Sequence, residues 1–78
     1  MRPALLDSVV LTRDLPECSL RAGDLGTVVE LYESGEVEAE FVTARGSTVA
    51  VVTLSDGDFR PVEATDVAAV RSVAVAAA

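Results

Sequence analysis

Carboxylates form the densest group of chemically capable side chains in this sequence. The stretch ELYESGEVEAE, residues 30–40, contains neither Lys nor Arg. Its glutamates are Glu30, Glu33, Glu36, Glu38 and Glu40. Two carboxylates can act as general acid and general base when burial separates their pKa values. These glutamates alternate as if along a solvated strand, and the chain contains no His. We therefore expect no catalytic residues.

The other candidate reactive groups are isolated. Asp56 and Asp58 lie in the turn SDGD, which offers too few oxygen ligands for a calcium site. Cys18 is the only cysteine, so it cannot form a disulfide within the chain, and without His it cannot build a zinc site. Because no imidazole can activate it, we interpret Cys18 as a structural or incidental thiol. We expect no metal site.

Gly23 and Gly26 occur in AGDLGT, which invites comparison with a phosphate-binding loop. No third glycine, lysine or helical pattern follows, so the dinucleotide-binding and P-loop hypotheses both fail. Backbone positions that need special angles are sufficient to explain the two glycines. We expect no cofactor.

The charge balance of the chain restricts its partners. Six arginines and no lysine oppose thirteen Asp and Glu residues, which gives 78 residues a net charge of −7. Nucleic acid is bound by cations that displace counterions from its phosphates, so nucleic acid and anionic membranes are poor partners here. A basic protein is an electrostatically suitable partner. The alternative is that the charge only keeps a valine-rich domain soluble.

Short apolar runs separated by turn residues predict an all-β fold. The runs cover residues 8–15, 27–32, 37–42, 47–54 and 59–62. Pro16 ends the first run, and Pro61 restricts the last run to a sheet edge, because proline cannot donate to a ladder. We expect one small domain, a barrel of about five antiparallel strands, over residues 1–63.

The N-terminal sequence MRPALLDSVVLT does not predict a signal peptide, because Asp7 and Ser8 interrupt its apolar run. No stretch approaches the ~20 apolar residues of a membrane span. A single unpaired thiol fits a reducing compartment. We therefore expect a cytoplasmic protein.

Residues 27–42 predict a β-hairpin with sorted faces. If ESG is a three-residue loop with Gly35 in the left-handed conformation, Leu31 faces Val37 and Val29 faces Ala39. The inward face then carries Val29, Leu31, Val37, Ala39 and Phe41, with Thr27 opposite Phe41. The outward face carries Val28, Glu30, Tyr32, Glu36, Glu38 and Glu40. A two-residue Ser-Gly loop would mix the faces, so the pattern favours three residues.

The glutamate-rich face of this hairpin is the candidate binding surface. Glu30 lies opposite Glu38 in the predicted register, and like charges across a strand pair are destabilising. Either solvent screens them or a cationic partner covers them. Exposed apolar residues rimmed by acids indicate a protein interface, although scattered surface valines are also normal. The candidate protein-binding residues are Val28, Glu30, Tyr32, Glu36, Glu38, Glu40 and Val42.

The C-terminal residues 64–78 have a different composition, rich in Ala and Val. A helix capped by Thr65 or Asp66 would place on one side Val67, Val70 and Ala74. Valine disfavours a helix, and a short isolated helix is marginal in water. We expect this tail to be a short helix, weakly ordered, or docked on its own barrel or on a neighbour.

Four segments carry a resemblance to a known family. In chain order they are VVLTRDLP, LRAGDLGTVVELY, EAEFV and VAVVTLSDGDFRPV. Over residues 5–63 the chain resembles the bacterial domain-of-unknown-function family 4926. The resemblance implies a small SH3-like β-barrel with no known enzymatic residues. Some members look like partners of neighbouring toxin-like genes, which implies an antitoxin or immunity role.

The segment GDLGTVV is also similar to the start of a KOW-type motif, in which a Gly-containing turn enters a strand of an SH3-like barrel. KOW domains that contact RNA usually bring basic residues. Here the following strands bring glutamates instead.

Together these features predict a non-enzymatic protein-interaction module, the acidic antitoxin or immunity-type partner of a basic protein. The product of an adjacent gene is the candidate partner. Two alternatives remain open. One is a nucleic-acid-associated KOW-like or SH3-like module. The other is an orphan structural domain that forms a homo-oligomer through an edge strand or its tail.

Overall fold

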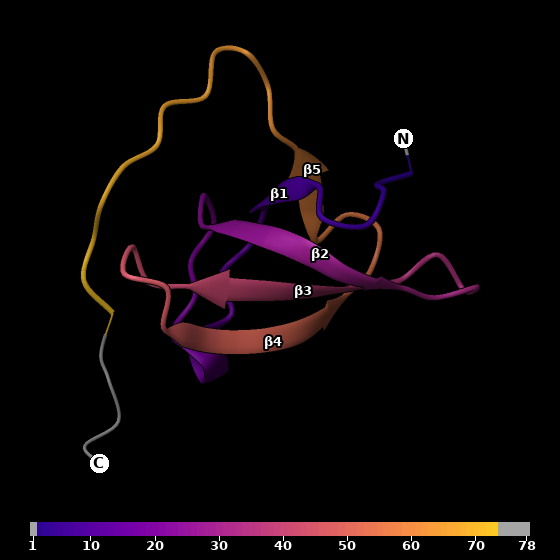
Figure 1. The fold of residues 1–78 in the computed structure, drawn as a ribbon, viewed down its shortest axis with the longest axis horizontal. Helices are drawn as coiled ribbons and strands as arrows, with labels where there is room; N and C mark the ends of the chain where they lie inside the picture. The colour runs from indigo at the N-terminus through magenta and orange to yellow at the C-terminus, as the bar shows by residue number, and fades with distance from the viewer. Residues whose placement is uncertain (1, 74–78) are drawn as a thin grey trace.

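Five β-strands and one short 3-10 turn make up the secondary structure of residues 2–73, the part of the chain that this computed structural model describes. In chain order they are β1 (Ser8–Leu11), η1 (Pro16–Cys18), β2 (Leu25–Leu31), β3 (Val37–Val42), β4 (Thr48–Leu54) and β5 (Phe59–Pro61), as drawn in Figure 1. The predicted all-β class is confirmed.

The strands form one antiparallel sheet in the order β4-β3-β2-β1-β5. Strands β1 to β4 follow one another as a meander, and β5 returns to pair with β1, Val10 lying opposite Arg60. The sheet curls so that β1 and β5 cross above β2 and β3 (Figure 1). This is the small SH3-like barrel that the sequence predicts.

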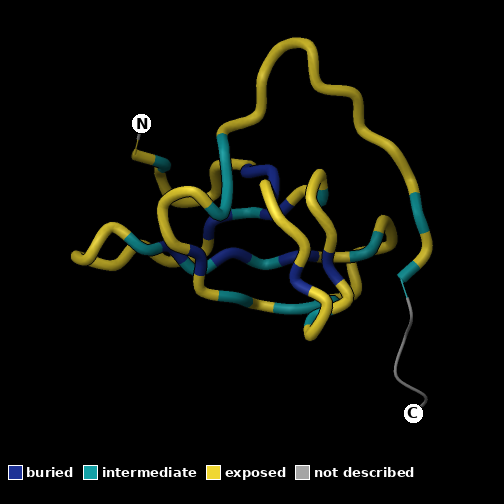
Figure 2. The backbone as a smooth tube through the Cα atoms, turned by 180° about the vertical axis from the view of Figure 1, so that it is seen from behind, coloured by how far each residue is buried: buried dark blue, intermediate teal, exposed yellow. Residues whose placement is uncertain are grey.

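The core lies inside the curl of the sheet, where Figure 2 shows the buried segments. Its residues are Val9, Leu11, Leu15, Leu20, Val28, Val37, Ala39, Phe41 and Leu54. Two of these leucines come from the long loop between β1 and β2, where Leu15 and Leu20 bridge each other. The loop leaves the sheet after Leu11 rather than at residue 15, because its backbone turns inward to bury this leucine pair.

The β2–β3 hairpin has the predicted three-residue loop. Gly35 has a φ of +94°, its N–H donates to the Tyr32 carbonyl over 3.0 Å, and the Tyr32 N–H donates to the Glu36 carbonyl over 3.0 Å. Leu31 pairs with Val37, and Glu30 pairs with Glu38, both as predicted. A glycine tolerates this left-handed conformation without steric cost.

Beyond Glu30 the predicted register is wrong. A bulge at Val29 shifts the pairing, so Val28 lies opposite Ala39 and Thr27 opposite Glu40. Val28 is therefore fully buried, not on the acidic face, while Val29 turns outward and is 38% exposed. A bulge adds one unpaired residue to one strand and reverses the facing of the residues beyond it.

Contacts with the N-terminal arm explain why the bulge forms where it does. The Val28 N–H donates to the Asp7 carbonyl over 2.9 Å, and the Val28 carbonyl accepts from the Leu6 N–H over 2.7 Å. These bonds fix Val28 between the arm and β3. No local pattern in the hairpin sequence contains this long-range information.

The tail has no helix within residues 64–73, so the predicted short helix is wrong for this segment. Asp66 does not cap a helix; its carboxylate closes a turn by accepting the Glu63 N–H over 2.7 Å. From there the chain runs beside the barrel (Figure 1) until the Arg71 guanidinium binds the Asp24 carboxylate and the Ser19 carbonyl. The predicted helical position Ala74 lies outside the described residues.

Candidate interaction face

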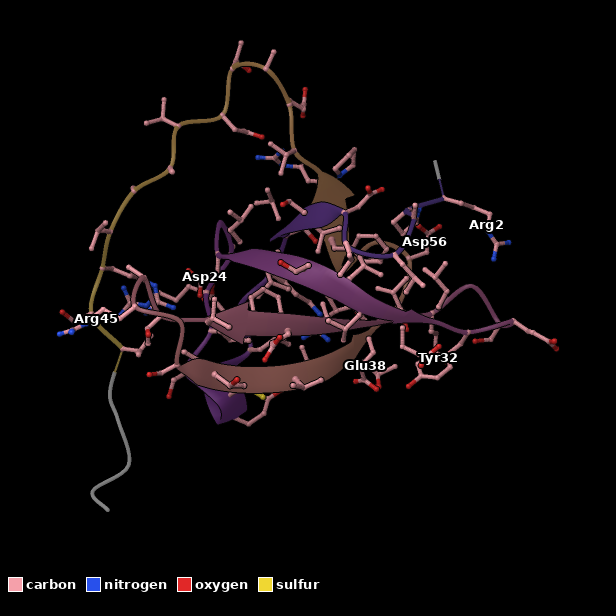
Figure 3. The ribbon with its side chains drawn as sticks, in the orientation of Figure 1. Arg2, Asp24, Tyr32, Glu38, Arg45 and Asp56 are labelled. Atoms are coloured by element: carbon pink, nitrogen blue, oxygen red, sulfur yellow. The ribbon has the colours of Figure 1, made fainter. Side chains whose placement is uncertain are left out.

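The outward side of β2, β3 and β4 brings together most of the predicted binding residues. We call it the acidic face, and its carboxylates are Glu30, Glu36, Glu38 and Glu40. Tyr32 lies beside them, since its hydroxyl donates to Glu38 over 2.6 Å. Figure 3 shows Tyr32 and Glu38 next to each other at the hairpin end of the sheet. Val42 continues the outward alternation of β3 and is exposed.

Val28 is the predicted binding residue that the structure removes from this face, because its side chain is buried. Two apolar residues take its place on the outside. Val29 is turned out by the bulge, and Val51 of β4 is 51% exposed opposite Glu40. The sequence pattern placed Val29 in the core and left the facing of Val51 open.

Neutral hydroxyl groups orient the carboxylates of the acidic face. Glu38 accepts from the Thr53 hydroxyl over 3.0 Å as well as from Tyr32. Glu40 accepts from the Thr48 hydroxyl over 2.7 Å. Glu36 accepts from the hydroxyls of Ser34 and Ser55, each over 3.2 Å. Such donors fix the carboxylate oxygens in place without cancelling their charge.

The ion pairs of the described residues lie elsewhere on the molecule. Arg13 binds Asp58 over 2.7 Å, and Arg71 binds Asp24. Arg60 contacts Asp66 over 2.9 Å and Glu63 over 3.5 Å. Within residues 2–73, no arginine forms an ion pair with a carboxylate of the acidic face. Its negative potential is therefore uncompensated by the chain itself.

The titration of Tyr32 reports this potential. The hydrogen bond to Glu38 raises the pKa of the Tyr32 hydroxyl, with smaller contributions from desolvation and from the charges of Glu38, Glu30 and Glu36. Each of these effects disfavours a phenolate beside carboxylates. Tyr32 thus stays a hydrogen-bond donor at neutral pH, with its ring 39% exposed.

Thr48 and Thr53 are site residues that sequence reasoning missed. The signal was present, because Thr53 lies directly opposite Glu38 once the β3–β4 register is laid out. Thr48 depends on the second bulge of the sheet, which shifts the β3–β4 register between Phe41 and Val42. Only the folded sheet places it near Glu40.

A cavity of about 550 Å³ adjoins the acidic face at the hairpin end of the sheet. It is formed by the N-terminal arm, the hairpin loop and the β4–β5 turn, with Arg2 and Asp56 at the same end of the molecule (Figure 3). Its lining residues are Arg2, Pro3, Leu31, Tyr32, Ser34, Gly35, Glu36, Val37, Ser55, Asp56 and Phe59. Leu31, predicted to point inward, lines this cavity and is 40% exposed.

The isolated reactive groups of the sequence do not converge on this cavity. Asp58 is engaged by Arg13 and by the Ser55 N–H, which together lower its pKa, while Asp56 is exposed. Cys18 lies in η1 and packs against the core. In the described part of the chain, no three His, Cys, Asp or Glu side chains gather as metal ligands do. Nor does any helix in that part have the length and apolarity to cross a membrane.

The family model described as "Domain of unknown function (DUF4926)" matches residues 5–61. The chain belongs to this family. The match of DUF4926 begins in the N-terminal arm that fixes Val28 and ends with β5, so it contains the whole sheet and the acidic face. No curated protein and no solved structure matches the chain.

Proposed function

We propose that this DUF4926 domain is a non-enzymatic module that binds a basic protein through its acidic face. The observation that carries the proposal is the state of the glutamates. Glu38 and Glu40 are held by the neutral hydroxyls of Tyr32, Thr53 and Thr48 and pair with no arginine among the described residues. Their charge is ordered and available to a partner.

Two kinds of contact would contribute to the complex. The negative potential would accelerate encounter with a cationic surface and select against acidic partners. The exposed apolar groups of Val29, Tyr32, Val42 and Val51 would supply area that leaves water on binding. Aromatic residues are enriched among the side chains that dominate binding energy, so Tyr32 is the expected anchor.

The partner class follows from the charge of the whole chain. A domain of net charge −7 is repelled by phosphate backbones, and three of its six arginines are already paired with carboxylates. We propose a protein partner rather than a nucleic acid. We further propose an antitoxin or immunity role in the cytoplasm, with the product of an adjacent gene as the candidate partner. The support is the acidity, the unpaired thiol of Cys18 and the family resemblance.

The test compares two variants with the same change in net charge. In one, Glu38→Gln and Glu40→Gln remove two charges from the acidic face. In the control, Glu17→Gln and Glu63→Gln remove two charges far from it. Each protein is used to capture partners from the native cell, and the adjacent gene product is purified for rate measurements.

We expect the acidic-face variant to associate with the purified partner about tenfold more slowly at low salt, while the control stays near the wild-type rate. The difference should shrink as salt shortens the screening length to about 3 Å at 1 M. Equal association rates for the two variants would contradict the proposal.

A further inference from the structure

The far edge of β4 is open. β4 ends the sheet and pairs only with β3. Outside that ladder, the backbone hydrogen bonds of residues 2–73 include none from Thr48–Leu54. In an antiparallel pair, alternate residues turn both N–H and C=O away from the neighbouring strand. One side of β4 therefore presents a row of free donors and acceptors.

The two edges of the sheet differ in how they are protected. β5 is three residues long and contains Arg60 and Pro61, which are typical devices against edge pairing. β4 is seven residues long, reads TVAVVTL, and contains neither a charge nor a proline. A long apolar edge of this kind is a template for a further strand.

A row of carboxylates runs alongside this edge. Glu36, Glu38 and Glu40 occupy alternate positions, about 7 Å apart along the strand. Ser55, Thr53 and Thr48, which belong to β4 or directly follow it, bind one carboxylate each. These bonds draw the charges across β4, toward the open edge.

We propose that the open edge of β4 pairs with an extended segment of a basic protein that carries Lys or Arg at every second position. This inference rests on the proposed function and adds its binding mode. An added strand would lie about 4.8 Å from β4, with alternate side chains on the acidic face. Its cations would reach the carboxylates, and their aliphatic stems would cover Val51.

Charge favours this occupant over a second copy of the chain. Two β4 edges paired by a two-fold axis would place both rows of Glu36, Glu38 and Glu40 on one face of a continuous sheet. Like charges on one sheet face oppose such pairing. A cationic strand instead forms ion pairs at the same positions.

The test uses a fluorescent heptapeptide of alternating Lys and Thr, the length of β4. A control heptapeptide carries N-methyl groups on its five central residues, so it keeps its charge and loses its backbone donors. The protein variants are Val51→Lys at the edge and Val62→Lys beyond β5, which change the net charge equally at similarly exposed sites. Binding is measured by anisotropy, and β4 amide protection by hydrogen exchange.

We expect the methylated peptide to bind at least about tenfold more weakly, because several backbone hydrogen bonds are lost. Val51→Lys should weaken the unmodified peptide more than Val62→Lys does, and alternate β4 amides should gain protection on binding. These results together support pairing at the β4 edge.

Three outcomes would overturn it. If both peptides bind equally and Glu38→Gln with Glu40→Gln weakens both, only charge matters; the edge is then excluded while the proposed function stands. If neither peptide binds, the edge inference fails, and the proposed function is decided by its own partner experiment. A concentration-dependent dimer that Val51→Lys abolishes would assign the edge to a second copy.

Discussion

Glu30 lies directly opposite Glu38 in the β2–β3 pair, with no cation of the described residues between them. Glu38 is held in place by the hydroxyls of Tyr32 and Thr53, so it cannot easily swing away. Two carboxylates facing each other across strands destabilise a sheet. The hairpin therefore keeps a like-charge pair that its own stability does not require.

Replacing Glu30 with Gln should stabilise the domain. Removal of the repulsion is expected to raise the free energy of unfolding by about 0.2–1 kcal/mol at low salt. Denaturant unfolding measures this change. Glu33→Gln, in the loop of the same hairpin, removes the same charge without a cross-strand partner and should have a smaller effect. A Glu30→Gln variant no more stable than this control would contradict the repulsion.

The raised pKa of Tyr32 should depend on Glu38. Tyr32 is the only tyrosine and the chain has no tryptophan, so ultraviolet absorbance follows its ionisation alone. We expect a midpoint above 10.0 in the wild type, and a lower one in Glu38→Gln. Because the pKa is raised on folding, the stabilisation from this contact is present at neutral pH and lost as the pH rises through the folded pKa. An unchanged midpoint in Glu38→Gln would assign the shift to another cause.

The bulge at Val29 predicts opposite sensitivities for two adjacent valines. Val28→Ala should cost about 1–3 kcal/mol of unfolding free energy, because it removes two buried methyl groups and leaves a cavity. Val29→Ala, at a 38% exposed site, should cost no more than about 0.5 kcal/mol. Thermal and denaturant unfolding of the two variants measure the contrast. The reverse order would restore the regular register that the sequence pattern suggests.

These two valines also mark how far the sequence determines the fold. Alternation and the turn residues were enough to predict the hairpin loop, the Glu30–Glu38 pair and the all-β class, since each depends on neighbours in the chain. The bulge was not predictable, because the Asp7 and Leu6 backbone that fixes Val28 is about twenty residues away. Local pattern cannot report a long-range contact of this kind.

The candidate site divides in the same way. The outward glutamates and Tyr32 follow from the period of β3 and its hairpin. The hydroxyls that orient them come from β4, so Thr53 required a register between strands and Thr48 required the second bulge. The open edge of β4 required the strand order, which the turn between β4 and β5 does not specify.

Gly26 should tolerate no side chain, because the ring of Phe41 covers it. A Cβ at Gly26 would lie 2.7 Å from two atoms of that ring. Since the ring is buried in the core, Gly26→Ala should cost about 1–3 kcal/mol of unfolding free energy. In a Phe41→Leu background the same change should cost at least about 0.5 kcal/mol less, because the two sites are in contact. Equal costs in both backgrounds would exclude a clash with Phe41.

Asp66 gives the tail a defined pH response. The guanidinium of Arg60 binds both carboxylate oxygens over 2.9 Å, and the Glu63 N–H adds a third hydrogen bond; together they lower the pKa of Asp66 to about 2. A lowered pKa means that the contact stabilises the fold above the ordinary value of 3.8 and loses this effect as the pH falls toward 2. NMR of the Asp66 carboxyl carbon should show that low midpoint. Arg60→Gln should return the midpoint toward 3.8, while Arg45→Gln, which removes the same charge in the β3–β4 turn, should leave it low. A wild-type midpoint already near 3.8 would mean that Arg60 does not hold the turn in solution.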